Sequence, residues 1–300
     1  MNQKIVDDIV WWIPFKKLRN LLRECLYNIT GYSRIIPIGH YESPYPSEDE
    51  LLKGFDKIYD GTSFMYNMYA INMNDEIQLE FYKNISQFFI NFDFSRDKDN
   101  INRYYYKNGW YEYGCAIYLY SVINYIKPKN IIEIGSGFST ALMLDINNKI
   151  FNNSINLLSI EPRPDRLKSL LLETDNIKLI EKNQEDVPLD IFKSLKENDI
   201  LFIDSSHVCK PFGDINRQFF EILPNLNKGV IVHIHDIPYP DYPKNWIYEE
   251  RRAYTEAYML RAFLQYNDTF EILCFPNYLK TKYSDIVKYN GGAIYLRKVK

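Results

Sequence analysis

Short apolar segments alternate with amphipathic segments from about residue 114 to the end of the chain. Strands are predicted at residues 130–135, 155–161, 177–182, 199–204, 229–236, 270–275 and 292–299. Helices are predicted at residues 114–126, 139–149, 163–173, 189–197, 212–226 and 246–265. Apolar strands that alternate with helices are typical of an α/β fold with a mostly parallel sheet buried on both faces. The last two strands have no predicted helix between them, so one of them should run antiparallel.

The first hundred residues follow a different pattern, which predicts a helical extension over 1–104 and a main domain over 105–300. Residues 11–27 carry apolar side chains at helical spacing, with basic side chains between them, at Lys16, Lys17, Arg19 and Arg23. Two interpretations stay open: a helix packed on the body with a solvated basic face, or a docking helix for a membrane surface or a partner enzyme. Turn residues over 41–50 precede a second helical pattern near 75–92.

Composition excludes several classes of protein. The 300 residues are 46% hydrophobic, enough to bury a sizeable core, and the net charge of −3 argues against a nucleic-acid surface. The four cysteines form no CxxC pair, so neither a zinc site nor a disulfide framework is indicated. No apolar run approaches the length of a membrane helix, and no signal peptide is visible. We therefore expect a cytoplasmic protein, either free or peripheral to a membrane.

The most informative motif is EIGSGFST, at the end of the first predicted strand. Gly135 and Gly137 permit a tight turn and a close approach of the backbone to a ligand. A dinucleotide-binding fingerprint would need a third glycine where the chain has Thr140. Glu133, two residues before the first glycine, suits a ligand with a positive charge, such as an amine or a sulfonium.

This motif resembles motif I of the class I S-adenosylmethionine (SAM) methyltransferases, which have a Rossmann-like fold with a seven-stranded sheet. The resemblance covers about residues 105–300 and continues at three further strand ends. It implies that Glu161 holds the ribose of SAM, that Glu185 and Asp186 lie near the adenine, and that Asp204 stands at motif IV. The cofactor-binding residues predicted in this way are Glu133, Gly135, Ser136, Gly137, Ser139, Thr140, Glu161, Glu185, Asp186 and Asp204.

Further segments resemble the branch of sugar and small-molecule O-methyltransferases of bacterial polysaccharide and antibiotic pathways. They are EIGSGFST, DSSH, HIHD and the stretch over 242–264. The resemblance implies methyl transfer to a hydroxyl of a sugar in capsule or surface-polysaccharide synthesis, with S-adenosylhomocysteine (SAH) as the second product. A nucleotide-activated sugar, such as a heptose or a deoxysugar, is one acceptor of this class. The alternatives are an NAD(P)-dependent oxidoreductase and a catalytically inactive SAM-binding partner protein.

Methyl transfer to a sugar hydroxyl needs a base or a metal ion, because the hydroxyl is barely acidic. His207 and His235 lie at the ends of the fourth and fifth strands, beside Asp204, and are the predicted catalytic residues. His233 shares the face of His235 and is predicted to be structural. In metal-dependent relatives the positions of Asp204, His235 and Asp236 carry Mg²⁺ ligands. A histidine at one of them is unfavourable for Mg²⁺, which leaves metal dependence open.

The segment after the fifth strand supplies the predicted acceptor site. Its candidate substrate-binding residues are Tyr239, Tyr242 and Trp246, as a pocket lining, and Arg251 and Arg252, which could bind a diphosphate. The alternative for the arginines is pairing with Glu249 or Glu256. Trp110, Tyr111 and Tyr113 precede the first helix of the main domain and are candidates to line the cleft, against a plain packing role. The oligomeric state is left open, and a homo-oligomer is compatible with the sequence.

Overall fold

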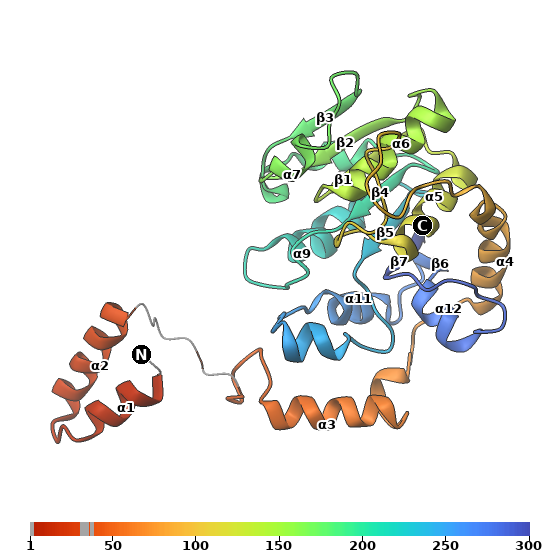
Figure 1. Ribbon diagram of the computed structural model, residues 1–300. Coiled ribbons are helices and arrows are strands. Elements are labelled where there is room, and N and C mark those ends of the chain that lie inside the picture. The colour runs from red at the N-terminus through yellow and green to blue at the C-terminus, as the bar shows by residue number, and fades with distance from the viewer. Residues whose placement is uncertain (1–2, 31–35, 37–38) are drawn as a thin grey trace. The chain divides into compact units, whose positions relative to one another are not determined.

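A computed structural model describes residues 3–30, 36 and 39–300 (Figure 1). The chain forms two compact units, residues 1–59 and residues 60–300. The first unit contains the helices α1 (Gln3–Trp11), α2 (Lys16–Thr30) and α3 (Glu48–Tyr59). Only α2 was predicted. Arg23 Nε lies 2.7 Å from Asp7 Oδ1 and so links α2 to α1. Among the described residues, no helix is long and apolar enough to span a bilayer.

The second unit is built on a seven-stranded sheet in the order β3-β2-β1-β4-β5-β7-β6. The first five strands pair in parallel, and β7 runs antiparallel to both β5 and β6. The strands are β1 (Asn130–Ile134), β2 (Asn156–Ile160), β3 (Ile177–Ile180), β4 (Ile200–Ile203), β5 (Ile231–His235), β6 (Phe270–Cys274) and β7 (Ala293–Lys298). This confirms the predicted fold: a Rossmann-like, mostly parallel seven-stranded sheet with one antiparallel strand.

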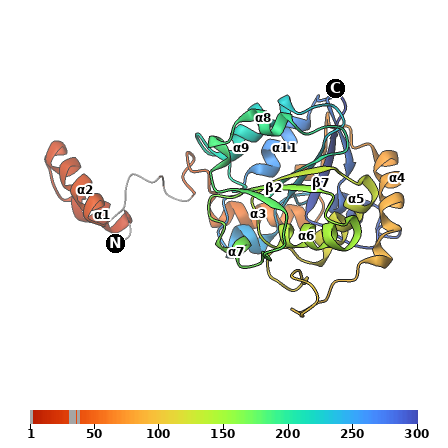
Figure 2. The same cartoon turned by 90° about the horizontal axis from the view of Figure 1, so that it is seen from above.

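Helices cover both faces of this sheet, which explains why the strands are apolar on both sides. The helices α5 and α6 lie along one face, and α8, α9 and α11 lie along the other (Figure 2). The helices of the second unit are α4 (Asp75–Ser86), α5 (Tyr113–Ile126), α6 (Phe138–Phe151), α7 (Asp165–Lys168), α8 (Leu189–Lys193), α9 (Asp214–Arg217), α10 (Leu223–Asn225), α11 (Glu256–Leu264) and α12 (Pro276–Lys282). Shorter helical turns are η1 (Phe64–Tyr66), η2 (Phe89–Asn91), η3 (Gln184–Asp186), η4 (Gln218–Ile222) and η5 (Asn245–Glu249).

The predicted pattern of helices was wrong in three details. The helix predicted over 246–265 is two pieces, η5 and α11, because the chain between them leaves the helical region and Arg251 has a φ of 57°. A helix, α12, does lie between the last two strands, and it begins with Pro276, a residue favoured in the first turn. The helix predicted over 163–173 shortens to the four residues of α7.

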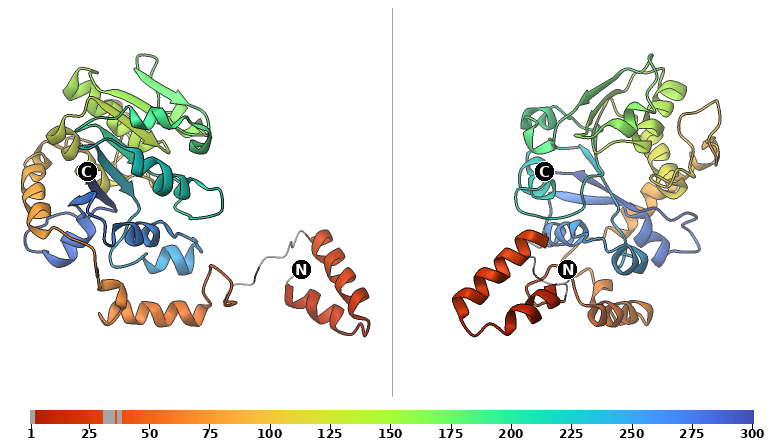
Figure 3. Two further views of the ribbon diagram at one scale, coloured as in Figure 1. Left: turned by 180° about the vertical axis from the view of Figure 1, so that it is seen from behind. Right: turned by 60° about the vertical axis from the view of Figure 1, so that its left-hand side comes forward.

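Residues 60–104 pack against the main fold. In two views α4 lies beside β6 and α12, at the edge of the sheet (Figures 1 and 3). Gln78 Oε1 accepts a hydrogen bond from the backbone N–H of Phe275, at 2.8 Å, and Tyr278 donates one to Asp75, at 2.8 Å. These contacts place this segment in the second compact unit. The functional boundary near residue 104 stays a prediction.

Candidate functional site: the carboxyl ends of the parallel strands

The turn after β1 depends on Gly135. Its φ is 83°, and a Cβ built on it would lie 1.8 Å from the carbonyl oxygen of Asp204. The backbone N–H of Asp204 also donates to the carbonyl of Ile134, at 2.9 Å. The ends of β1 and β4 therefore approach so closely that only glycine fits, and this approach brings the glycine turn beside Asp204.

Glu133, on β1, stabilises this turn through buried hydrogen bonds. Its carboxylate accepts hydrogen bonds from three hydroxyls, those of Ser139 (2.7 Å), Thr140 (2.6 Å) and Ser159 (2.5 Å), and its side chain is 1% exposed. Burial raises the pKa of Glu133 to about 7, although the three hydroxyls oppose the rise. The carboxylate therefore ties β1, β2 and the start of α6 together. The prediction that it faces a cationic ligand is replaced by this scaffolding role, and Thr140 shares it.

Two adjoining cavities open at the carboxyl ends of the strands, as expected for this class of sheet. The larger has a volume of about 760 Å³ and the smaller about 400 Å³. Both are lined by Ser136, Glu161, Arg166, Asp204, Ser205 and Ser206. The cavities thus meet at the glycine turn and at the ends of β2 and β4. Together they can hold one elongated ligand and a second molecule beside it.

Glu161 stands at the junction of the two cavities. One of its oxygens accepts the backbone N–H of Ser136, at 3.2 Å, and the other accepts that of Arg163, at 2.8 Å. Each oxygen keeps a lone pair for a ligand hydroxyl, which fits the predicted ribose contact. Glu185, predicted to lie near the adenine, lines the smaller cavity together with Asn183 and Gln184. Asp186 does not line either cavity, so its predicted contact with the adenine is not supported.

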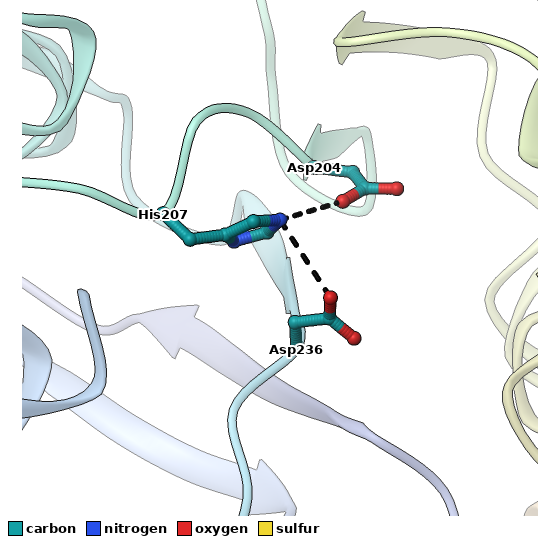
Figure 4. A group of neighbouring side chains, drawn as sticks. All are labelled: Asp204, His207 and Asp236. Atoms are coloured by element: carbon teal, nitrogen blue, oxygen red, sulfur yellow. Dashed lines mark ion pairs between the residues drawn. The ribbon is translucent and has the colours of Figure 1, made fainter. Parts of the chain in front are cut away.

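Asp204, His207 and Asp236 converge on the larger cavity from the ends of β4 and β5 (Figure 4). His207 Nε2 lies 3.2 Å from Asp204 Oδ1 and 3.7 Å from Asp236 Oδ2. Ligand atoms from the three side chains all lie within 4.8 Å of one another, which is close enough to hold one metal ion. The metal set predicted from the sequence contained His235. The structure replaces it with His207.

The electrostatics of this group favour a positive charge between the carboxylates. Burial opposes charge on Asp204, but the neighbouring His235 and His207 hold its pKa well below the usual range. Burial likewise opposes charge on His207, but contacts with Asp204 and Glu256 raise its pKa well above the usual range. These contacts favour the protonated form of the His207 ring unless another cation takes its place between the carboxylates.

Of the two histidines of β5, His235, which was predicted to be catalytic, lines the larger cavity, and His233 does not. His235 Nδ1 is 3.4 Å from Asp204 Oδ1 and 3.3 Å from Asp236 Oδ1, and its ring lies 5.0 Å from that of Tyr111. His233 is fully buried and stacks on Phe202 at 4.1 Å between ring centroids, which agrees with the structural role predicted for it. Burial lowers the pKa of His233 well below its usual value, so this ring is neutral.

Trp246, Arg252 and Tyr254, from the segment after β5, also line the larger cavity. The Arg252 guanidinium lies over the Trp246 ring at 4.8 Å and pairs with Glu250 at 2.6 Å. Arg251 lies instead over Tyr248, outside this lining, so its predicted role in binding the acceptor is not supported. Of the two arginines proposed from the sequence, the structure therefore brings only Arg252 to the cavity.

Three tyrosines predicted to bind the acceptor have packing roles. Tyr113 packs on Phe92, Tyr106 and Tyr289. Tyr242 is buried, and its hydroxyl accepts the backbone N–H of Ala257 at 2.9 Å. Tyr239 lines a separate, mostly apolar pocket and donates to the carbonyl of Tyr66. We therefore reassign all three to the structural framework.

Two features of the site were missed in the sequence. Glu256 Oε2 lies 2.8 Å from His207 Nδ1, although 49 residues separate them, so no local pattern could have indicated the pair. The Arg166 guanidinium lies 3.5 Å from the centroid of the Trp110 ring, and its Cδ would be 3.1 Å from a Cβ on Gly137. Trp110 was one of the candidates to line the cleft. No role in the site was predicted for Arg166, because it lay inside a longer predicted helix.

Comparison with known proteins identifies the family. Residues 132–237 match the model of a methyltransferase domain family. The chain is also 35% identical over 168 residues to an uncharacterized protein of Archaeoglobus fulgidus, an alignment that covers 55% of this chain and 76% of that protein. The chain belongs to the class I SAM-dependent methyltransferases. The order of the seven strands in this methyltransferase is the one typical of that class.

Solved structures similar to this methyltransferase include an SAH-bound methyltransferase of Podospora anserina, PaMTH1, with 14% identity and a TM-score of 0.41 over 85% of this chain and 98% of that one. An SAH complex of CmcI-N160 has 19% identity and a TM-score of 0.39 over 61% of this chain and 75% of that one. Membership of the family decides against the dinucleotide-dependent oxidoreductase considered from the sequence.

Proposed function

We propose that this methyltransferase transfers the methyl group of SAM to a hydroxyl oxygen of a sugar. The observation that carries the proposal is the position of the Asp204–His207–Asp236 group. It lies in the larger cavity, directly beyond the junction marked by Glu161 and the glycine turn. Adenosine fits the smaller cavity, with its ribose at Glu161, and the methionine part then reaches the larger one. This path directs the methyl group toward the acid–histidine group.

The aromatic and basic residues that line the larger cavity support a sugar acceptor, and a nucleotide-linked sugar in particular. Trp246 and Tyr254 offer aromatic faces on which a sugar or a base can stack, and Arg252 offers a guanidinium suited to phosphate. The volume of about 760 Å³ leaves room for such an acceptor beside the methionine part of SAM. A role in the synthesis of capsule or surface polysaccharide, in the cytoplasm, follows from the sequence resemblance and stays a prediction.

The transfer needs one proton acceptor. The acceptor oxygen attacks the methyl carbon in line with the carbon–sulfur bond. The electrons of that bond move to the sulfur, so the sulfonium of SAM becomes the neutral thioether of SAH. His207 Nε2 first releases its own proton to solvent. It then accepts the proton of the acceptor hydroxyl, and that proton later leaves to solvent by the same route. The positive sulfonium of bound SAM opposes the protonated ring and so favours the neutral histidine that the step requires. Asp204 and Asp236 stabilise the imidazolium that forms.

A divalent metal is the alternative catalyst at the same place. Two carboxylates and one imidazole are a reasonable donor set for Mn²⁺, Fe²⁺ or Zn²⁺, and a poorer one for Mg²⁺, which prefers oxygen. Asp204, His207 and Asp236 would hold the ion. A bound ion would lower the pKa of the acceptor hydroxyl. His207 would then serve as a ligand, and the proton would leave through solvent.

Mass spectrometry of a panel of nucleotide sugars incubated with the protein and SAM tests the proposal. We expect one acceptor to gain about 14 Da, with equimolar SAH, and the gain to disappear in His207→Ala. SAH binding measured by calorimetry should survive in this variant. Tight SAH binding without a methylated product across sugars and nucleotide sugars would instead favour the catalytically inactive SAM-binding protein.

A peripheral contact with a membrane through residues 11–30 is a second proposal, which concerns location. Trp11, Trp12 and Phe15, at the turn between α1 and α2, are 69%, 86% and 71% exposed, and Lys16 and Lys17 follow them directly. Exposed aromatic rings beside basic residues are typical of helices that lie at an anionic lipid surface. Sedimentation with vesicles containing phosphatidylserine should bring down the wild type but not a variant with Trp11, Trp12 and Phe15 replaced by serine. Equal sedimentation of both would contradict it.

A further inference from the structure

Glu256 is the first residue of α11, and it is a fully buried carboxylate with a histidine as its polar partner. Its side chain is 0% exposed, and Oε2 lies 2.8 Å from His207 Nδ1. The other oxygen, Oε1, has no hydrogen-bond partner among the residues that the structure describes. Burying a carboxylate is costly, and removal of its partner would be more costly still. The buried side chains of Glu256 and His207 therefore depend on each other for their polar contacts.

The backbone around the pair is locked as well. His207 has a φ of 58°, and its carbonyl accepts the backbone N–H groups of both Thr255, at 2.9 Å, and Glu256, at 3.1 Å. The hydroxyl of Thr255 accepts the N–H of Cys209, at 2.7 Å. The loop after β4 is thus fastened to the start of α11 at four points, including the side-chain pair. This arrangement fixes both the position and the plane of the His207 ring.

The chemistry of the carboxylate bears on which ring nitrogen is available for reaction. Burial raises the pKa of Glu256, although its contact with His207 opposes the rise. While the glutamate is ionised it only accepts hydrogen bonds, so Nδ1 carries the hydrogen in the 2.8 Å contact. In the neutral ring the lone pair then belongs to Nε2, the atom that faces Asp204 Oδ1 and Asp236 Oδ2. The opposite tautomer would set the Nδ1 lone pair against a buried carboxylate.

We propose that Glu256 is the positioning residue of the reaction centre: it holds His207 as the Nδ1–H tautomer and aims the Nε2 lone pair at the transferring proton. The inference rests on the proposed methyl transfer and adds the residue that orients its base. If a metal occupies the site, the same contact aims Nε2 at the ion, because a histidine ligand is ordinarily oriented by a hydrogen bond from its other nitrogen. Glu256 itself lines neither of the two cavities, so it acts on the reaction only through His207.

NMR of protein labelled with ¹⁵N in histidine measures the tautomer directly and needs no acceptor. Long-range ¹H–¹⁵N spectra distinguish a protonated from a bare ring nitrogen, and His207→Asn assigns the signals. At a pH high enough for the ring to be neutral, with SAH bound, we expect Nδ1 to be protonated and Nε2 to be bare. A wild-type ring with a bare Nδ1 would overturn the proposal, even if Glu256 variants failed to fold.

Glu256→Gln keeps the shape of the side chain but adds an N–H donor. We expect the His207 ring in this variant to shift toward the opposite tautomer. Methyl transfer to the acceptor found by the panel should fall about 10–100-fold in kcat, the usual effect of losing an orienting partner, with an unchanged KM for SAM. Glu249→Gln, at an exposed glutamate of the same segment, makes the same change of charge and should leave tautomer and rate unaltered.

The two proposals can fail separately. An unaltered tautomer and full turnover in Glu256→Gln would reject the positioning role while methyl transfer stands. A correct tautomer in the wild type that shifts in Glu256→Gln, together with no methylated acceptor, would support the positioning role and reject the activity.

Discussion

At the scale of single residues, two carboxylates of similar sequence context do different work. Glu133 and Glu161 both end or nearly end a parallel strand, yet Glu133 is sealed under the glycine turn and Glu161 faces the two cavities. The difference lies in their neighbours. Three hydroxyls saturate Glu133, whereas Glu161 is held by two backbone N–H groups that leave its outer face free.

Replacing Glu161 tests the cofactor assignment. Glu161→Ala should weaken SAM binding by about 1–3 kcal/mol, because it removes hydrogen bonds from the ribose hydroxyls to a charged group. Glu161→Gln should weaken binding less, since one acceptor remains. Calorimetry with SAM and SAH measures both. Glu173→Ala is the control, at an exposed site outside the cavities. An unchanged dissociation constant in Glu161→Ala would show that the ribose lies elsewhere.

Glu133 should make folding stability depend on pH. Its pKa of about 7 in the folded state lies above the ordinary value of 4.5, so between these values the folded state binds the extra proton. Its contribution is therefore present below about pH 4.5 and is lost as the pH rises through 7. Glu133→Gln removes this dependence. Between pH 5 and pH 8 the stability of the variant should rise relative to the wild type by up to about 3 kcal/mol, measured by urea unfolding. If the free energy of unfolding changed with pH in the same way in the wild type and in Glu133→Gln, the assigned pKa would be contradicted.

Metal removal separates the two catalysts proposed for the acid–histidine group. If His207 acts as the base alone, turnover should survive dialysis against EDTA. If an ion is needed, EDTA should abolish turnover and added Mn²⁺ should restore it, with Asp236→Asn as damaging as loss of the ion. SAH binding is the control, because neither Asp236 nor His207 belongs to the predicted cofactor set. Loss of turnover that no divalent ion restores would count against the metal alternative.

At the scale of elements, the site is made by loops that leave the strands on the same edge of the sheet. The glycine turn follows β1, Glu161 follows β2, Asp204 and His207 follow β4, and Asp236 follows β5. The break between η5 and α11 matters equally. It exposes the start of α11 to the loop after β4, so that Glu256 can reach His207. A continuous helix over 246–265, as the sequence suggested, would leave no free end at this point.

The two glycines of the turn should differ in their tolerance of alanine. Gly135→Ala places a Cβ 1.8 Å from the backbone oxygen of Asp204, at a φ of 83°, so β1 and β4 must separate. We expect a loss of at least about 2 kcal/mol of stability. Gly137→Ala is also strained, at a φ of 155°, but its Cβ meets only the flexible side chain of Arg166, at 3.1 Å, so it should cost less stability than Gly135→Ala and should weaken SAH binding. Thermal unfolding and calorimetry test this order, and equal unfolding temperatures in the two variants would contradict it.

At the scale of the whole molecule, the chemistry belongs to the second compact unit. Residues that line the two cavities all come from positions between 109 and 292. The helices α1 and α2 belong to the first unit, which folds around contacts of its own, such as that between Arg23 and Asp7. Both proposals, membrane contact by the first unit and methyl transfer by the second, are therefore open to separate tests.

Deletion of residues 1–30 should therefore leave SAH affinity and turnover of a soluble acceptor unchanged, while binding to anionic vesicles is lost. The full-length protein, assayed side by side for vesicle sedimentation and methyl transfer, is the reference. A truncated protein that binds SAH normally but has lost all turnover would mean that this segment helps to build the acceptor site.

The sequence alone determined the fold of residues 105–300, the family and the cofactor, because these depend on local signals. Apolar runs of strand length, helical spacing between them, and glycines and acids at strand ends are all readable along the chain. Glu161, Glu185 and Asp204 were found through the resemblance to the family's motifs, and His207, Trp246 and Arg252 through their position after the fourth and fifth strands. Each of the six lines one of the cavities.

Only the tertiary structure decided which of these side chains act together. Glu133 was taken for a ligand-binding acid because the sequence does not show that three hydroxyls enclose it. Tyr242 and Tyr113 are aromatic residues beside the site in sequence, but Tyr242 is buried and Tyr113 is partly buried against the core, so neither lines the two cavities. The pair of His207 and Glu256 spans 49 residues and depends on a break in a helix. Contacts of this kind form when segments that are distant in the sequence pack together, so neither periodicity nor motif spacing can indicate them.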